Sequence, residues 1–237
     1  STANVKAALA GNFAAAYTGN VTINDANGSS IAAVDLSTIA GDTSGTVTVS
    51  NNINITGTAA AVATAAGDVV AATANVTLSD THTVNQLKTI NDGTTGIITL
   101  SNYSVALSGN SDVVAAALRG TFASSYTGNV TLSDTPTVAQ LAAIDAATTG
   151  TIIIGDGGGG GGDQIIGTSA QVLATLQGLS NHSGSVTITD NHTLDQLKDI
   201  NNLTTGTITL NNYSVALSGS TANVKAALAG NFAAAYT

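Results

Sequence analysis

The sequence lacks several residue types altogether, and each absence excludes a kind of site. Cysteine, methionine, tryptophan and glutamate do not occur. Without cysteine the chain forms neither a disulfide framework nor a thiolate metal site. Cysteine and methionine are also the side chains that oxidise most readily, so their absence suits long exposure to an oxidising, extracellular environment.

Charge is also scarce, and basic charge is the scarcest. The formal net charge is −9, and all fourteen acidic residues are Asp. The basic residues are dispersed along the chain, so they form no positive patch for nucleic acid or anionic lipid. They are Lys6, Lys88, Arg119, Lys198 and Lys225. No apolar run approaches the roughly 20 residues that cross a bilayer. We therefore expect no nucleic-acid partner and no membrane insertion.

A tandem repeat of about 54 residues organises the chain. Each copy begins with a motif such as VTLSDT, and three copies continue with a helix-like motif such as TVNQLKTI and then TTG. We divide the chain into the end of a preceding repeat and four repeats. Their ranges are 1–20, 21–75, 76–129, 130–185 and 186–237. Residues 1–18 are identical to residues 220–237, so we expect the chain to belong to a longer array.

Two alternating periods predict the secondary structure of each repeat. VTLSD and GTITL alternate apolar with small polar residues, which is typical of half-buried strands. Val84, Leu87 and Ile90 mark a short helix, and Val224, Leu228, Phe232 and Tyr236 mark a longer one. Strands joined by helical crossovers normally run parallel, with right-handed connections. The prediction is an α/β fold, namely a right-handed α/β solenoid with parallel strands and two helices per repeat.

Several polar residues recur at one repeat position and are candidates for binding. Asp25, Asp80, Asp134 and Asp190 could form an acidic ladder for divalent ions or cap the helix that follows each of them, and we favour capping. The aromatic residues obey the repeat register, which favours a stacked core over ligand binding.

The histidines are not predicted to bind metal. His82 and His192 share their repeat position with Pro136, so we interpret both as surface residues near a helix start. His182 is interpreted as a loop residue. None has the companion ligands that zinc would need.

One segment, 155–167, breaks the repeat with the sequence GDGGGGGGDQIIG. Residues 158–166 fit the G-G-x-G-x-D-x-U-x pattern and so resemble the calcium-binding nonapeptides of RTX proteins. The resemblance implies a Ca²⁺ site, and its candidate ligands are Asp156, Gly159, Gly161 and Asp163. RTX sites are shared between stacked nonapeptides, however, and this chain has one copy. The alternative is a flexible glycine insertion that binds no ion.

The pattern of the whole chain is similar to the repeat regions of very large bacterial surface proteins, including RTX-type adhesins and oscillin-like fibril proteins of cyanobacteria. This resemblance implies export to the cell surface and a role in surface layers, adhesion or gliding. We expect a structural segment of a secreted, extracellular filament, fibril or surface layer that assembles by end-to-end stacking. Its expected partners are copies of itself, with surface polysaccharide as a further candidate.

Three other functions are considered. The first alternative is a calcium-stabilised stalk of an RTX-type adhesin, and the second is a Thr-rich, ice-binding solenoid with rows such as Thr207 and Thr209. An enzyme is not expected, because no G-x-S-x-G elbow, Ser-His-Asp spacing or differentiated carboxylate pair is present. No cofactor is required in this interpretation, and calcium is the one candidate ion.

Overall fold

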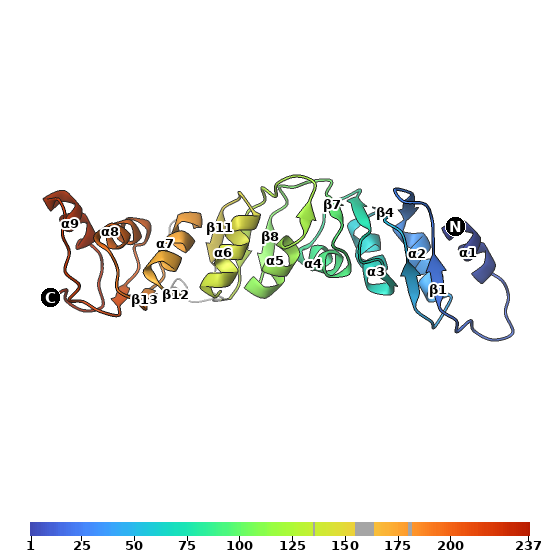
Figure 1. The fold of residues 1–237 in the computed structure, drawn as a ribbon, viewed down its shortest axis with the longest axis horizontal. Coiled ribbons are helices and arrows are strands. Elements are labelled where there is room, and N and C mark those ends of the chain that lie inside the picture. Colours follow the sequence, from blue (N-terminus) through green and yellow to red (C-terminus); the bar gives the residue numbers. More distant parts are fainter. Residues whose placement is uncertain (135, 155–163, 180–181) are drawn as a thin grey trace. The chain divides into compact units, whose positions relative to one another are not determined.

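A computed structural model describes residues 1–134, 136–154, 164–179 and 182–237. The chain is a mixed α/β protein in which helices of seven to ten residues alternate with strands of two to four residues (Figure 1). Within the described ranges every paired strand runs parallel to its neighbour, and no sheet closes into a barrel. The predicted α/β class and the parallel strands are confirmed.

The chain divides into two compact units. Unit 1 contains residues 1–105 and 116–127, and unit 2 contains residues 106–115 and 128–237. Helix α5 (Ser111–Leu118) therefore contributes its first residues to unit 2 and its last residues to unit 1.

In unit 1, consecutive helices pack side by side in chain order, and two parallel sheets accompany them (Figure 1). The helices are α1 (Thr2–Leu9), α2 (Ala33–Gly41), α3 (Ala59–Asp68) and α4 (Val84–Gly93). The first sheet has the order β1 (Val21–Ile23), β3 (Val47–Val49) and β5 (Val69–Val70). The second has the order β2 (Ser30–Ala32), β4 (Asn54–Gly57), β6 (Asn75–Leu78), β7 (Ile97–Thr99) and β9 (Thr121–Phe122).

Unit 2 is built in the same way. Its helices after α5 are α6 (Val138–Ala147), α7 (Ser169–Gly178), α8 (Leu194–Leu203) and α9 (Thr221–Ala227), and each packs on the next. One sheet has the order β11 (Ile152–Ile154), β10 (Val130–Leu132) and β8 (Leu107–Gly109). The other has the order β12 (Ile165–Gly167), β13 (Val186–Ile188) and β14 (Ile208–Leu210).

The order of strand pairing recurs along the chain. In unit 1, β4 pairs with β6, β6 with β7, and β7 with β9. In unit 2, β8, β10 and β11 form the equivalent series, which a single bridge from Ile152 to Leu179 extends. The series β12, β13 and β14 ends likewise in a bridge from Ile208 to Phe232. The order in which the strands pair therefore recurs together with the repeated strand motif of the sequence.

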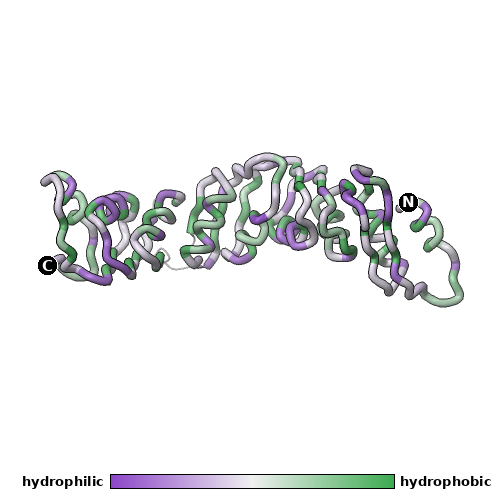
Figure 2. Tube along the Cα trace, in the orientation of Figure 1, coloured by the Kyte–Doolittle hydropathy of each residue, from purple (hydrophilic) through white to green (hydrophobic). Residues whose placement is uncertain are grey.

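The core lies between the strands and the helices. The register aligns Ile55, Val76 and Ile98, which are all buried, because one face of the β4, β6 and β7 strands packs inward. Leu87 and Ile90 of α4 are also fully buried. Hydrophobic and hydrophilic residues alternate over short stretches of the chain (Figure 2). None of the helices described has the length and apolarity to span a membrane.

The glycine of the TTG motif is required by a close approach of two backbone segments. A Cβ at Gly96, Gly150 or Gly206 would lie 2.2, 2.1 or 1.7 Å from a carbonyl oxygen of an earlier turn, at Ala74, Gly128 or Gly184 respectively. The first Thr of the motif reinforces each turn. The Thr148 hydroxyl, for example, donates a 2.9 Å hydrogen bond to the Gly128 carbonyl. The motif thus joins two turns of the chain.

The predicted longer helix is wrong in its extent. Helices α5 and α9 end at Leu118 and Ala227, so Phe122 lies in β9 and Phe232 in a strand-like bridge. The helix stops where the chain passes close to another helix. A Cβ at Gly120 would lie 1.7 Å from the Asn91 side-chain oxygen, so any larger residue here would displace the Asn91 side chain. Phe122 and Phe232, which follow these helices, therefore pair with strands instead of extending the helix.

The close approach at TTG predicts a large effect for one added methyl group. Gly150→Ala should destabilise the protein by roughly 2 kcal/mol or more, because the clash is with backbone that cannot rotate away. Gly67→Ala is the matched control, since nothing lies within 4 Å of its Cβ position and Ala favours the α3 helix by about 0.5–1 kcal/mol. Urea unfolding of both variants measures the difference. Equal stability of G150A and the parent chain would contradict this account of the motif.

Candidate functional site

The most regular polar feature of the molecule is a carboxylate at the first residue of a helix. Asp25 accepts hydrogen bonds from the Thr2 backbone N–H at 2.7 Å and from the Thr2 hydroxyl at 2.6 Å. Three equivalent carboxylates accept from the first N–H of α3, α5 and α7. These contacts are Asp80 with Ala59 at 2.6 Å, Asp134 with Ser111 at 2.7 Å and Asp190 with Ser169 at 2.7 Å. Each satisfies an N–H that has no partner within its helix and places negative charge at the positive end of the helix dipole.

These carboxylates bind a different helix from the one predicted. Each Asp lies 21 or 23 residues after the first residue of the helix whose N-terminus it binds, so it joins two segments of the chain. The helix that follows Asp80 is instead capped by Thr83, whose hydroxyl accepts from the Gln86 N–H while the Gln86 side chain accepts from Thr83 N–H. Helices α6 and α8 have the same capping box. The T-x-x-Q spacing could have identified this capping box from the sequence alone.

The best-defined electrostatic effect of this contact is at Asp25. The hydroxyl of Thr2 donates to the Asp25 carboxylate and holds its pKa below the ordinary value, and this outweighs the opposing effect of partial burial. The contact with the helix start therefore favours the ionised form of the Asp25 carboxylate.

The opposite ends of some helices have a matching contact. The amide of Asn91, near the end of α4, donates to the Ala117 carbonyl in the last turn of α5. Asn201 of α8 donates equivalently to the Ala226 carbonyl of α9 at 2.7 Å. The last carbonyls of a helix have no intrahelical donor, so the asparagine amides satisfy them.

Two histidines form a repeated, buried pair with tyrosine. His82 Nε2 lies 3.1 Å from the Tyr126 hydroxyl, and His192 Nε2 lies 3.0 Å from the Tyr236 hydroxyl. Both hydroxyls donate to a backbone carbonyl at 2.6 Å, Val105 and Val215 respectively. Each hydroxyl proton is therefore already used, so the tyrosine oxygen accepts from a neutral histidine protonated at Nε2.

The prediction that His82 and His192 are surface residues is wrong. They are 4% and 3% exposed, because each ring packs edge-on against its tyrosine. Burial lowers the pKa of both histidines, partly opposed by the nearby Asp80 and Asp190 carboxylates. Within the described part of the chain neither Nδ1 atom has a hydrogen-bond partner. His182 is also buried and lies in a parallel bridge with Thr204 rather than in a free loop.

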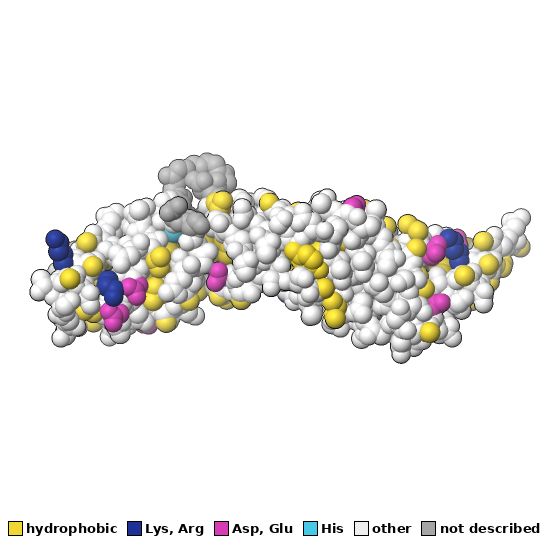
Figure 3. Space-filling view, turned by 90° about the horizontal axis from the view of Figure 1, so that it is seen from above, with side chains coloured by type: hydrophobic (Ala, Val, Ile, Leu, Met, Phe, Trp, Pro, Cys, Tyr) yellow, Lys and Arg dark blue, Asp and Glu magenta, His cyan; other side chains and the backbone are white. Residues whose placement is uncertain are grey.

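The described surface offers few groups for chemistry. The face in Figure 3 has few charged side chains, and basic side chains lie beside acidic ones on it. A cavity of about 390 Å³ in unit 1 is lined by Asn91, Asp92, Thr94, Arg119 and Gly120 among others. Its Asp92 carboxylate is paired with both Lys88 and Arg119, so the carboxylate is already occupied by two cations. Three or more His, Cys, Asp or Glu side chains do not cluster as a metal site anywhere in the described ranges.

The predicted calcium ligands Asp156, Gly159, Gly161 and Asp163 lie outside the described residues. The four repeat-equivalent aspartates do not gather as an acidic ladder, since each binds its own helix. The geometry thus defines a set of recurring contacts between chain neighbours. No protein-family model, curated protein or solved structure matches this chain.

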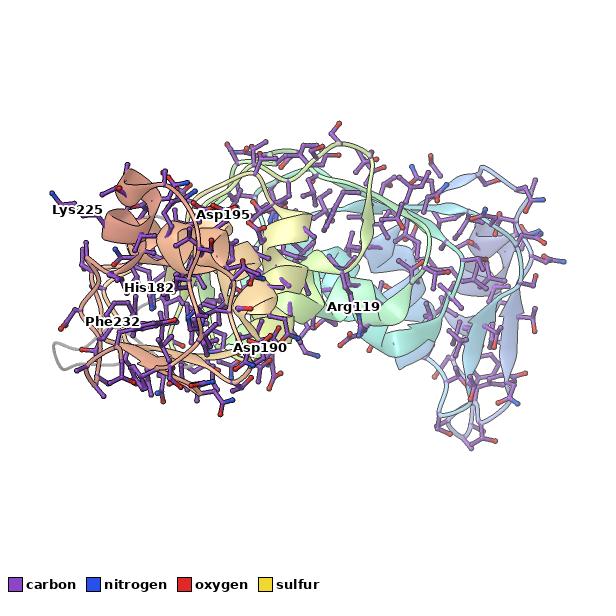
Figure 4. The ribbon with its side chains drawn as sticks, turned by 60° about the vertical axis from the view of Figure 1, so that its left-hand side comes forward. Arg119, His182, Asp190, Asp195, Lys225 and Phe232 are labelled. Atoms are coloured by element: carbon purple, nitrogen blue, oxygen red, sulfur yellow. The ribbon has the colours of Figure 1, made fainter. Side chains whose placement is uncertain are left out.

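The carboxylate contact predicts a stability cost for its removal. Asp190→Ala should destabilise the protein by about 1–2 kcal/mol, because the Ser169 N–H and hydroxyl lose their acceptor at the start of α7 (Asp190 is labelled in Figure 4). Asp42→Ala is the control: this exposed residue has no side-chain partner among the residues described, so the change should stay within about 0.5 kcal/mol. Chemical denaturation of both variants tests the contact, and similar losses would refute it.

The buried histidines predict a loss of stability in mild acid. Because the folded state lowers their pKa, the unfolded chain binds more protons as pH falls below the ordinary histidine value of 6.5. Stability should be complete above that pH and decline below it, by at most about 1.4 kcal/mol per pH unit for each histidine.

Replacing both histidines with glutamine provides the control for this pH dependence. His82→Gln with His192→Gln keeps an N–H donor for each tyrosine but cannot titrate. Urea unfolding from pH 8 to pH 4.5 should show a flatter profile for this double variant. An unchanged slope would show that other groups cause the decline.

Proposed function

We propose that this chain is a structural repeat segment of a secreted surface filament, fibril or surface layer, built as an α/β solenoid of tandem repeats of about 54 residues. The observation that carries the proposal is the repeated Asp-to-helix contact. It occurs at four equivalent places, and each time it joins segments that are close in sequence. In a solenoid each repeat contacts only its neighbours, and this is the contact pattern expected of one.

The distribution of polar groups supports a structural role over catalysis. The buried histidines hydrogen-bond to tyrosines, and the conspicuous carboxylates bind helix ends, so these groups are occupied by structural partners. Catalytic sites instead bring different groups together around a space for substrate. The proposal therefore includes no enzymatic activity and no required cofactor.

The proposed location is extracellular, at the cell surface, with copies of the chain as the main partner and surface polysaccharide as a second one. The absence of cysteine and methionine supports an oxidising exterior. The five basic residues also offer few cleavage sites to trypsin-like proteases.

An ice-binding surface is a second candidate, and one observation favours it. The register places Thr56, Thr77 and Thr99 in one row on consecutive strands of unit 1. In unit 2, however, Thr131 lies between Ser108 and Ile153, so the threonine row is interrupted there. Strong inhibition of ice recrystallisation by the purified chain would favour this candidate. The calcium-stabilised stalk depends on residues 155–163, which lie outside the described ranges.

The structural proposal predicts that the purified chain assembles. Negative-stain electron microscopy at increasing protein concentration should show unbranched filaments, because exposed strand edges and helix faces at the ends of a solenoid favour end-to-end contact. A chain that remains monomeric at all concentrations in both microscopy and sedimentation would argue against the filament function.

A further inference from the structure

The cavity of unit 1 is lined mainly by groups that form hydrogen bonds. Asp92 and Thr95 come from the end of α4 and the TTG motif, whereas Arg119 and Thr121 come from the segment after α5. Ala72 is the one wholly apolar side chain among the lining residues. The volume of about 390 Å³ lies near the lower end of the roughly 300–1,000 Å³ of ligand pockets, which suits a small, polar ligand.

Positive charge exceeds negative charge in the ion-pair cluster at this cavity. Lys88 Nζ lies 2.5 Å from one oxygen of Asp92, and Arg119 pairs with the other oxygen. Two cations therefore share one carboxylate, although the chain as a whole has a net charge of −9. The ion pairs of Lys198 show the opposite balance, since that cation pairs with two aspartates. The cluster at the cavity therefore favours an anionic ligand.

The charged pair of the cavity departs from the repeat. Asp92 corresponds to Asn202 in the later repeat, and Arg119, the only arginine of the chain, corresponds to Ala229. The amide contact between neighbouring helix ends forms in both turns, so that contact does not require the charged pair. The pair is also largely exposed, and exposed ion pairs contribute little to stability. A binding role explains the two charged residues better than folding does.

The cation and the hydrogen-bonding groups are both accessible to a ligand. The Arg119 side chain (labelled in Figure 4) is 60% exposed, and its ion pair uses one terminal nitrogen of a guanidinium that has further N–H donors for a carboxylate. Thr95 and Thr121 are exposed, so their hydroxyls can bond to a ligand. Asp92 and Gly93 also line the cavity, and their backbone carbonyls in the last turn of α4 have no intrahelical donor. These acceptors require a ligand with several hydroxyl donors.

We propose that this cavity binds a carboxylate-bearing sugar unit, namely a uronic acid residue of an acidic polysaccharide. The carboxylate of the sugar pairs with Arg119, while its hydroxyl groups bond to Thr95, Thr121 and the end of α4. A uronic acid combines one carboxylate with several hydroxyls on a single ring, and this is the combination that the lining requires. The inference rests on the proposed polysaccharide partner and specifies its chemistry and its site.

Titration of the full chain with short acidic oligosaccharides tests the site. The probes are oligomers of glucuronate, galacturonate and mannuronate, and the matched controls are neutral oligomers of glucose, galactose and mannose. Isothermal titration calorimetry should show that at least one acidic oligomer binds roughly tenfold or more tightly than its neutral counterpart, and that added salt weakens this binding. Binding of no acidic oligomer, or equal binding of acidic and neutral oligomers, would overturn the proposal.

Two substitutions at the cavity should change this binding in opposite directions. Arg119→Ala should weaken binding roughly tenfold or more, and the chain has alanine at the equivalent positions, 10 and 229, so the turn should tolerate it. Asp92→Asn removes the carboxylate that competes for both cations, so this variant should bind more tightly. Weaker binding by D92N would contradict recognition of a sugar carboxylate. Lys198→Ala in α8 of unit 2 is the control and should leave binding unchanged.

Acetate distinguishes a sugar site from a site for simple anions. It carries the carboxylate without the ring hydroxyls, so it should bind roughly tenfold or more weakly than the acidic oligomer. Equal binding of acetate would show that the hydroxyl groups are not recognised and would refute a sugar site.

Electron microscopy of the same preparations separates this proposal from the proposed structural function. Filaments that form while no acidic oligomer binds would refute the cavity as a sugar site and leave the filament function standing. Binding of the acidic oligomer by a chain that forms no filaments would support the site and argue against the filament function.

Discussion

The stability of this protein depends on helix ends that are satisfied by neighbouring parts of the chain. Helices of seven to ten residues are too short to be stable alone in water, and strands of two to four residues are equally dependent on partners. The Asp carboxylates supply acceptors at helix starts, and Asn91 and Asn201 supply donors at helix ends. A helix that depends on one of these contacts therefore completes its hydrogen bonding only when an adjacent segment has folded, and this applies to α1, α3, α5, α7 and α9. The glycine of TTG lets those segments approach closely enough.

Much of the fold could be predicted from the sequence because each element carries a local pattern. The alternation in VTLSD predicts a strand, and β6 and β10 lie there; Val84, Leu87 and Ile90 predict a helix, and α4 contains all three. The longer helix could not be predicted correctly. Its apolar spacing continues through Phe122, whereas α5 ends at Leu118 and Gly120 then passes close to the Asn91 side chain, a tertiary contact that no local pattern shows. The repeat unit itself and the domain boundaries remain predictions.

The candidate site was predicted in kind but not in detail. Capping by Asp was the right chemistry, yet the helix concerned lies earlier in the chain, and no local pattern shows which helix start is near. Burial of His82 was missed for a similar reason, since its partner Tyr126 is 44 residues away. The same separation joins His192 to Tyr236, so the shared spacing was a signal in the sequence. The burial of these histidines is therefore better predicted from a partner that recurs at a fixed sequence separation than from their immediate neighbours in the sequence.

The Asp-to-helix contact also has a direction. In all four cases the carboxylate belongs to the later residue and the helix start to the earlier one. A chain held together in this way is polar, because every such contact joins a helix start on its earlier side to a carboxylate on its later side. An assembly that uses this contact is heterologous and cannot close as a two-fold dimer, so growth and length control at its two ends would be separate processes.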